Sequence, residues 1–116
     1  MGIEIGSFNA IPSSIDGGCC MFYKHQRDIR NKRYLMVNDM ATSAYMQING
    51  RMEEFTLVSS GKNVFWYRNK EFSLKVKINK KHNAKARKSF NVNGTIVVTD
   101  LYKNKKKISF CGDCGW

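Results

Sequence analysis

Apolar and polar residues alternate along much of this chain, and a period of two indicates β-strands. The clearest case is residues 72–78, where every second side chain is apolar and those between are serine or lysine. A strand of this kind buries one face and leaves the other in water. Residues 44–48 and 51–58 flank Asn49-Gly50, a pair that supplies the two positive φ angles of a type I′ turn. These segments predict a β-hairpin.

Further strand signals are spread over the rest of the chain. Residues 95–99 and 107–111 predict a second hairpin around 101–106, and shorter strands are predicted at 20–23, 34–37 and 63–67. Helix signals are confined to a turn or two within 26–34, and the basic segment 79–89 is predicted to be an exposed, mobile loop. About eight short strands with frequent turns are typical of a small antiparallel β-barrel or sandwich. The predicted fold class is therefore all-β.

The length of 116 residues fits one domain. We expect residues 1–18 to form a poorly ordered or extended N-terminal segment and residues 19–116 to form a single β-barrel domain. A chain of this size can bury a core without help from a metal or cofactor, so none is expected. No apolar run is long enough to span a bilayer as a helix.

Four cysteines lie in two groups towards opposite ends of the chain: Cys19, Cys20, Cys111 and Cys114. Adjacent cysteines pair poorly with each other, so we expect at least one disulfide to join the early pair to the late pair. Two alternatives use the same residues. A four-cysteine zinc site would take Cys111 and Cys114 as one half, and a redox role would use the same Cys-x-x-Cys spacing.

A disulfide implies an oxidising compartment. The opening residues lack the charged and apolar regions of a signal peptide, so an exported protein would have lost its leader already. We expect a periplasmic or secreted protein, with a lipid anchor as one form of that export. Reduced cysteines would instead indicate the cytoplasm.

The chain carries 20 Lys plus Arg against 9 Asp plus Glu, a formal net charge of +11. No acid occurs between Glu71 and Asp100, and lysines are dense there and in the last predicted hairpin. Such a field attracts polyanions, either nucleic acid or anionic glycan, although a solvated surface would also look like this. The candidate polyanion contacts are Lys80, Lys81, Lys85, Arg87, Lys88, Lys103, Lys105 and Lys106.

Residue patterns of catalysis are missing from the sequence. The two histidines, His25 and His82, stand in polar, basic surroundings without an orienting partner nearby, and no phosphate-binding loop or metal-binding motif occurs. The adjacent Glu53 and Glu54 would point to opposite faces of a strand and cannot form a carboxylate pair. The sequence predicts a protein that binds and does not catalyse, with no metal site.

One ordered series of segments resembles a known family. Residues 34–39, 44–50, 55–62 and 64–66 follow the order of strand, Gly turn, Ser-Gly loop and Phe-Trp strand seen in the membrane-bound inhibitors of C-type lysozyme. The likeness covers roughly a third of the chain. As a whole, the chain also resembles uncharacterised short bacterial lipoproteins and secreted domains.

The resemblance implies a function and a site. In the inhibitor family, a loop serine and a downstream lysine meet the two catalytic carboxylates of lysozyme, and by position these roles fall to Ser60 and Lys70, with Lys62 nearby. Charge-assisted hydrogen bonds of that kind are strong. The sequence departs from the family at Val64, where the family has tyrosine, and at Glu71, where it has glycine. The resulting hypothesis is a non-enzymatic binding protein of the bacterial cell envelope, with a lysozyme as its protein partner; polyanion binding is the alternative. The oligomeric state is left open.

Overall fold

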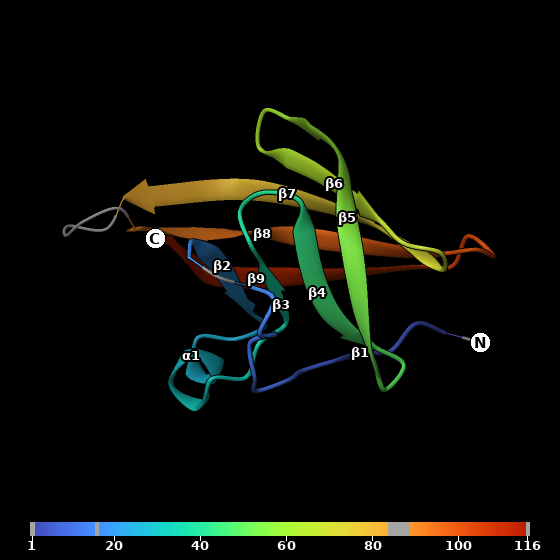
Figure 1. The fold of residues 1–116 in the computed structure, drawn as a ribbon, viewed down its shortest axis with the longest axis horizontal. Helices are drawn as coiled ribbons and strands as arrows, with labels where there is room; N and C mark the ends of the chain where they lie inside the picture. Colours follow the sequence, from blue (N-terminus) through green and yellow to red (C-terminus); the bar gives the residue numbers. More distant parts are fainter. Residues whose placement is uncertain (1, 16, 84–88, 116) are drawn as a thin grey trace.

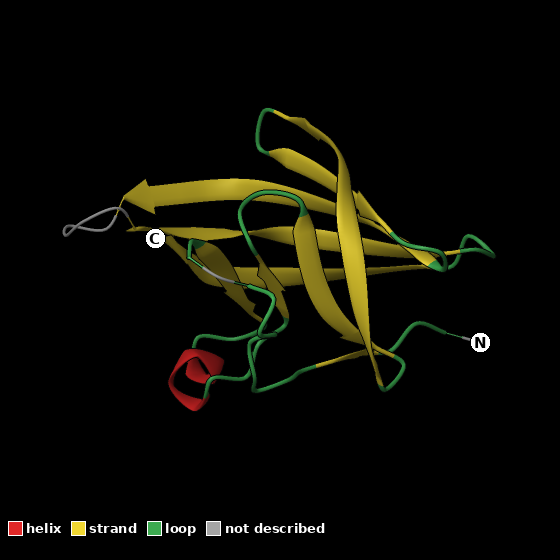
Figure 2. Cartoon of the chain, in the orientation of Figure 1, coloured by secondary structure: helices red, strands yellow, loops and turns green. Residues whose placement is uncertain are grey.

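The structure is a computed structural model that describes residues 2–15, 17–83 and 89–115. Most of its chain is β-strand, as Figure 2 shows, joined by loops and with one short helix among the described residues, outside the sheet. The strands are β1 (Ile5–Gly6), β2 (Cys19–Tyr23), β3 (Met36–Asn38), β4 (Ser43–Ile48), β5 (Arg51–Gly61), β6 (Val64–Arg68), β7 (Phe72–Asn83), β8 (Ser89–Asp100) and β9 (Lys105–Gly115), and the helix is α1 (Arg27–Asn31).

Eight strands close into an antiparallel barrel. The hydrogen-bonded order runs β4-β3-β2-β9-β8-β7-β6-β5, and β5 pairs with β4 again, so the sheet returns to its start. Strand β1 is an extra strand that pairs with the end of β4. In Figure 1 the long strands β7, β8 and β9 lie side by side, while β4 and β5 run steeply across them. The predicted all-β class and strand number are confirmed.

The two predicted hairpins are present. Asn49 and Gly50 join β4 to β5 with φ angles of 53° and 81°, which is the left-handed conformation that their sequence favours. Residues 101–104 join β8 to β9, and the Asp100 carboxylate holds that turn by accepting hydrogen bonds from the backbone N–H groups of Tyr102 and Asn104, both at 2.9 Å. The side-chain amide of Asn104 also donates to this carboxylate, at 3.0 Å, and that hydrogen bond, followed by the two backbone ones, lowers the pKa of Asp100.

The core fills the barrel from the inward side of every strand. Alternation places Phe72, Leu74 and Val76 inside and Ser73, Lys75 and Lys77 outside, as the sequence pattern predicts. The largest fully buried side chains inside the barrel are Phe55, Met36, Met46, Ile48, Leu74, Ile96, Val76 and Val98.

A second apolar cluster lies outside the barrel on β2 and β3. Tyr23, Tyr34 and Val37 are buried there beneath Phe8 of the N-terminal segment and Ile29 of α1. Residues 2–8 run in an extended path, held by β1 and by an isolated bridge between Phe8 and Tyr34, and a bend and a turn follow before residue 15. The short α1 agrees with the turn or two predicted within 26–34. No helix in the described part of the chain has the length and apolar character needed to cross a bilayer.

The structure corrects the loop predicted over residues 79–89 and confirms the predicted disulfide. Residues 79–83, predicted to belong to an exposed loop over 79–89, continue β7, because a bulge interrupts the alternation that marks the strand without ending its pairing with β8. Ser89 of that predicted loop begins β8, and residues 84–88 lie outside the described residues. A disulfide joins Cys20 to Cys114 across neighbouring positions of β2 and β9, 94 residues apart in sequence. The expected bond between the early and late cysteines is thus confirmed.

Candidate functional site

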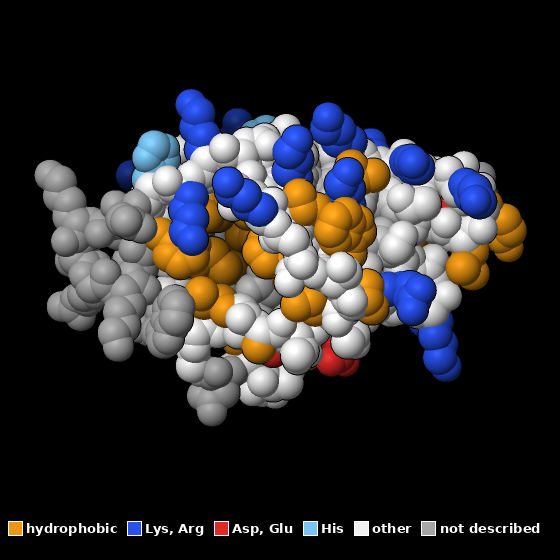
Figure 3. All heavy atoms as spheres, turned by 90° about the horizontal axis from the view of Figure 1, so that it is seen from above, with side chains coloured by type: hydrophobic (Ala, Val, Ile, Leu, Met, Phe, Trp, Pro, Cys, Tyr) orange, Lys and Arg blue, Asp and Glu red, His pale blue; other side chains and the backbone are white. Residues whose placement is uncertain are grey.

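One end of the barrel is hollow, and we call this end the mouth. It is framed by the loop 39–42, the turn 62–63, the end of β7 and the start of β8. The cavity has a volume of about 320 Å³, within the range of about 300–1,000 Å³ typical of small-molecule sites. In the space-filling view of Figure 3, hydrophobic side chains line a hollow in the surface. Its apolar lining includes Leu57, Phe65, Val76, Ile78, Phe90 and Val92.

A β-bulge in β7 turns Lys81 into the mouth. The register with β8 shifts between Ile78 and Lys80, so the inward side passes from Ile78 to Lys81 instead of Lys80. A bulge inserts one extra residue and re-aims the side chains that follow it. Lys81 lines the cavity, and its ammonium lies 4.4 Å from the centroid of the Phe90 ring. This is a cation–π contact at the rim of an apolar cavity.

Gly94 makes the bulge possible. It pairs with Ile78 on the neighbouring strand, and a Cβ atom at this position would overlap the backbone carbonyl oxygen of Lys77. Only glycine permits so close an approach of two backbones. The N–H of Ile78 donates to the carbonyl of Asn63 at 2.8 Å, which ties the bulge to the turn between β5 and β6.

A second bulge acts in the same way on β5. The register with β6 shifts between Leu57 and Ser59, and the bulged Val58 is exposed. Beyond it, Ser60 pairs with the inward-facing Phe65 and lines the cavity. Both the serine and the lysine of the mouth are thus directed inward by an irregularity of their own strand.

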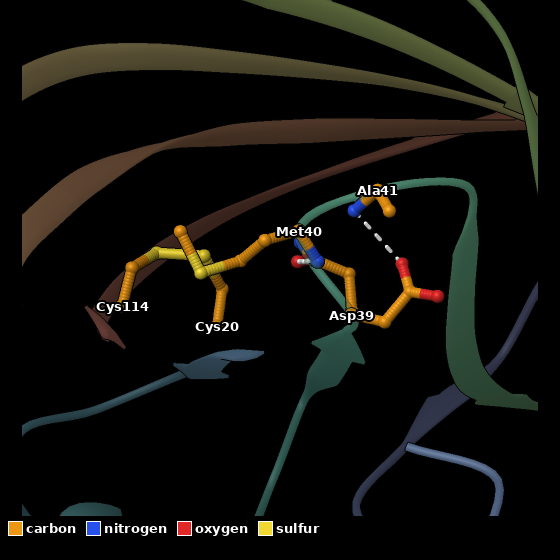
Figure 4. The surroundings of a disulfide bond; sticks show 6 residues. Cys20, Asp39, Met40, Ala41 and Cys114 are labelled. Carbon is orange, nitrogen blue, oxygen red and sulfur yellow. Dashed lines mark hydrogen bonds between the residues drawn. A yellow bond between two sulfur atoms is a disulfide. The ribbon is translucent and has the colours of Figure 1, made fainter. Parts of the chain in front are cut away.

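The disulfide forms part of the cavity wall. Cys20 and Cys114 both line the cavity, and beside them Phe22 stacks on Phe110 with ring centroids 4.0 Å apart. Figure 4 shows the Met40 side chain extending from its loop toward the two sulfur atoms. One wall of the mouth is therefore built from a covalent bond and soft apolar side chains.

The loop beside the mouth is tied down by Asp39. Its carboxylate accepts hydrogen bonds from the backbone N–H groups of Ala41, Thr42 and Ser43 at 2.9–3.0 Å, the first of which is drawn in Figure 4. Tyr67 is buried below, and burial together with the charge of Asp39 raises the pKa of its hydroxyl to about 12. Tyr67 therefore stays neutral throughout the ordinary pH range.

The outside of β6–β9 carries a second candidate site, which we call the basic face. Lys75 stands between Trp66 of β6 and Val97 of β8 in the register, and the next position along is Lys107 of β9. Trp66 is 39 % exposed, so its ring is available to a partner. The outward side chains of these strands from Val64 to Ser109 include no Asp or Glu within the described residues. The cations of the basic face are Arg68, Lys75, Lys77, Lys80, Lys105 and Lys107.

The structure divides the lysines predicted to bind polyanions. Lys80 and Lys105 belong to the basic face, Lys81 to the mouth, and Lys103 to the exposed turn between β8 and β9. Lys106 is exposed next to the N-terminal segment, near Ile3. Lys85, Arg87 and Lys88 lie outside the described residues. The site prediction left out Arg68, Lys75, Lys77, Lys107 and Trp66, although the alternation in residues 72–78 already assigns Lys75 and Lys77 to one outward side.

The lysozyme-type residues are also divided. Ser60 and Lys62 lie together at the mouth, whereas Lys70 lies in the turn between β6 and β7 at the opposite end of the barrel, which we call the turn end. The five residues of β6 separate the two positions by about 16 Å along the strand. The structure does not bring Ser60 and Lys70 together.

The disulfide decides between the cysteine alternatives. Because Cys20 and Cys114 are bonded to each other, neither is available to a four-thiolate zinc site or to a redox pair with Cys111. Cys19 and Cys111 are free thiols on the outward side of β2 and β9, and the register pairs them with Gly115 and Tyr23. Burial raises the pKa of both thiols.

Comparisons with protein-family models, with curated proteins and with solved structures find no match to this chain. The two candidate sites therefore stand on their geometry and their charge.

Proposed function

We propose that this protein acts by binding and not by catalysis, and that its basic face holds a linear polyanion. The observation that carries the proposal is the row of six cations around an exposed tryptophan, with no acid among the outward side chains described on these strands between Val64 and Ser109; Asp113 follows only farther along β9. From the level of Ser73 to Lys80 the row extends about 23 Å along β7. A row of this length matches an extended chain of anionic groups better than a single ion.

The side chains of the basic face favour general electrostatic attraction of a polyanion over recognition of a particular nucleotide or sugar sequence. Five of the six cations are lysines, which act as point charges and recognise phosphate or sulfate without fixed geometry. Trp66 adds a flat apolar ring on which a nucleic-acid base can stack. In the view of Figure 3, from above, lysine and arginine side chains are spread over the visible surface and few acidic ones are seen. The Cys20–Cys114 disulfide supports a place outside reducing compartments.

The proposal is tested with two probes, heparin and a short oligodeoxythymidylate, over a series of salt concentrations. We expect the logarithm of the affinity to fall linearly with the logarithm of the salt concentration, because binding releases counterions. The triple variant Lys75→Gln, Lys77→Gln, Lys107→Gln should bind at least about tenfold more weakly at low salt and show a shallower salt slope.

A matched control removes the same net charge elsewhere. Lys70→Gln, Lys103→Gln, Lys106→Gln takes three exposed lysines from the turn end and should keep most of the affinity. Equal losses in both triple variants, or no binding of either probe, would overturn the proposal. Trp66→Leu separates the two probes: a loss for the oligonucleotide alone identifies base stacking, and a loss for neither assigns the binding to charge.

Lysozyme inhibition remains a separate prediction of the sequence resemblance. The distance between Ser60 and Lys70 favours the polyanion proposal, because one enzyme cleft would have to meet both ends of β6. Turnover of a C-type lysozyme at stoichiometric protein, with Ser60→Ala as the variant, tests it directly. Unchanged turnover would remove this prediction.

A further inference from the structure

The cavity at the mouth is independent of the basic face, because its lining faces the inside of the barrel. We propose that this cavity binds an anionic amphiphile, with an unbranched alkyl chain between the apolar walls and a carboxylate head group at the ammonium of Lys81. Neither the sequence resemblance nor polyanion binding calls for such a site. Four features of the mouth lead to this ligand chemistry.

The first feature is the apolar wall. Ten of the sixteen lining residues are Phe, Leu, Ile, Val, Met, Ala or Tyr, the disulfide adds two more, and the remaining four are Asn38, Ser60, Asn63 and Lys81. An alkyl chain that fills a cavity with such a wall removes apolar surface of both the protein and the ligand from water. The ligand must therefore have an apolar part that enters the barrel.

The second feature is the size of the cavity. If each non-hydrogen atom occupies about the 30 Å³ that water takes in the liquid, about 320 Å³ holds roughly ten such atoms. That is room for a medium-length alkyl chain, and too little for a folded peptide. A polyanion has no apolar part of this length and is not the ligand of the cavity.

The third feature is the charge at the rim. Lys81 is exposed, forms no ion pair with any described residue, and is held at the opening by its contact with the ring of Phe90. No lining residue is acidic. The nearby carboxylate of Asp39 is already engaged by three backbone N–H groups of its own loop. The free ammonium therefore faces an opening in which the ligand supplies the missing anion.

The fourth feature is the placement of Lys81 itself. An uninterrupted strand would have pointed Lys80 inward and Lys81 outward, and the bulge opposite Gly94 exchanges them. Bulges recur where a side chain must be re-aimed at a site. Lys80 therefore supplies a matched control for Lys81, since these neighbouring lysines of β7 point to opposite sides of the sheet.

The test is calorimetric titration of the disulfide-intact protein with octanoate, decanoate and decyltrimethylammonium. We expect decanoate to bind about sixteenfold more tightly than octanoate, about fourfold for each methylene buried. Decyltrimethylammonium should bind at least about fivefold more weakly than decanoate, because its head group is repelled by Lys81. No heat of binding with decanoate up to millimolar concentration would overturn the proposal.

Three variants locate the ligand. Lys81→Met should lower the affinity for decanoate about fivefold, so that decanoate and decyltrimethylammonium bind equally well. Lys80→Met should leave the affinities for both ligands unchanged. Ala41→Trp places a large ring at the rim from an exposed loop position and should abolish binding without disturbing the core. Equal losses of decanoate affinity in Lys81→Met and Lys80→Met would contradict the proposed contact between the head group and Lys81. Unchanged decanoate affinity in Ala41→Trp would show that the cavity is not the binding site. The triple variant of the basic face should bind decanoate normally, so that this proposal and the polyanion proposal fail or stand separately.

Discussion

The two ends of the barrel are built from the same strands but are filled differently. Towards the turn end the inward side chains of Ile48, Leu74 and Val98 are 0–1 % exposed and belong to one core cluster. At the mouth the same strands enclose about 320 Å³ of space, with Ser60 and Lys81 among the lining. The difference follows from strand regularity. Where alternation is unbroken the barrel is solid, and where β5 and β7 bulge it opens and admits polar side chains.

The largest expected effect comes from the covalent link at the mouth. Replacing the pair by Cys20→Ser, Cys114→Ser should lower the free energy of unfolding by about 4.5 kcal/mol, because the bond closes a loop that spans most of the chain. Urea unfolding followed by circular dichroism measures this. The double variant Cys19→Ser, Cys111→Ser removes the free thiols and should unfold at the wild-type midpoint. An unchanged urea midpoint in the Cys20→Ser, Cys114→Ser variant would show that the disulfide does not contribute to the stability of the barrel.

A leucine-to-alanine change at each end measures the difference in packing. Leu74 is 1 % exposed in the solid part of the barrel, so Leu74→Ala should cost about 3 kcal/mol in unfolding free energy. Leu57 is only partly buried and lines the cavity, so Leu57→Ala should cost about 1 kcal/mol, since the space around it is already present. The same urea titration measures both. Equal costs would mean that the mouth is as tightly packed as the turn end.

Two glycines test whether the bulge of β7 depends on close backbone approach. Gly94→Ala should cost about 2 kcal/mol, because its methyl group would overlap the carbonyl of Lys77. Gly61→Ala serves as the control, since a Cβ there meets no atom within 4 Å, and should change stability by less than about 0.5 kcal/mol. Thermal unfolding compares the two. A silent Gly94→Ala would mean that β7 and β8 can separate at no cost.

The smallest expected effect concerns alkaline pH at the mouth. The pKa of Tyr67 is about 12 in the folded protein against about 10 for an ordinary tyrosine, so the unfolded chain loses this proton first as pH rises. Tyr67 therefore contributes stability that is complete below pH 10 and is lost as pH climbs toward 12, about 1 kcal/mol by pH 11. Urea midpoints at pH 9 and 11 should fall less for Tyr67→Phe than for the wild type. An identical fall in both would place the loss at other groups.

The sequence predicts the fold well because alternation and turn chemistry are local. Residues 72–78 and the Asn49-Gly50 turn carry their structure in their own residue types, and the barrel follows from enough such strands. The disulfide could be predicted only as a bond between the early and late cysteines. The choice of Cys20 with Cys114 depends on the register of β2 against β9, which no local pattern encodes.

The sites were predicted less well, for a physical reason. A bulge changes which residues face inward, and the residue type that accompanies this one, Gly94, lies on the neighbouring strand, so within β7 Lys80 and Lys81 look equivalent in the sequence. Spacing along the chain also misleads in hairpins. Ser60 and Lys70 are ten residues apart in sequence, yet β6 carries the chain from one end of the barrel to the other between them. Lysines that are close together in the sequence are likewise divided among the mouth, the basic face and the turn end.

The bond between Cys20 and Cys114 also fixes how the molecule responds to tension. Ninety-four positions separate the two residues, but they are neighbours on β2 and β9. When the two termini are pulled apart, the force passes through the sulfur atoms and bypasses everything between them. Only the segments before Cys20 and after Cys114 can lengthen, so the barrel is mechanically shielded for as long as the covalent bond lasts.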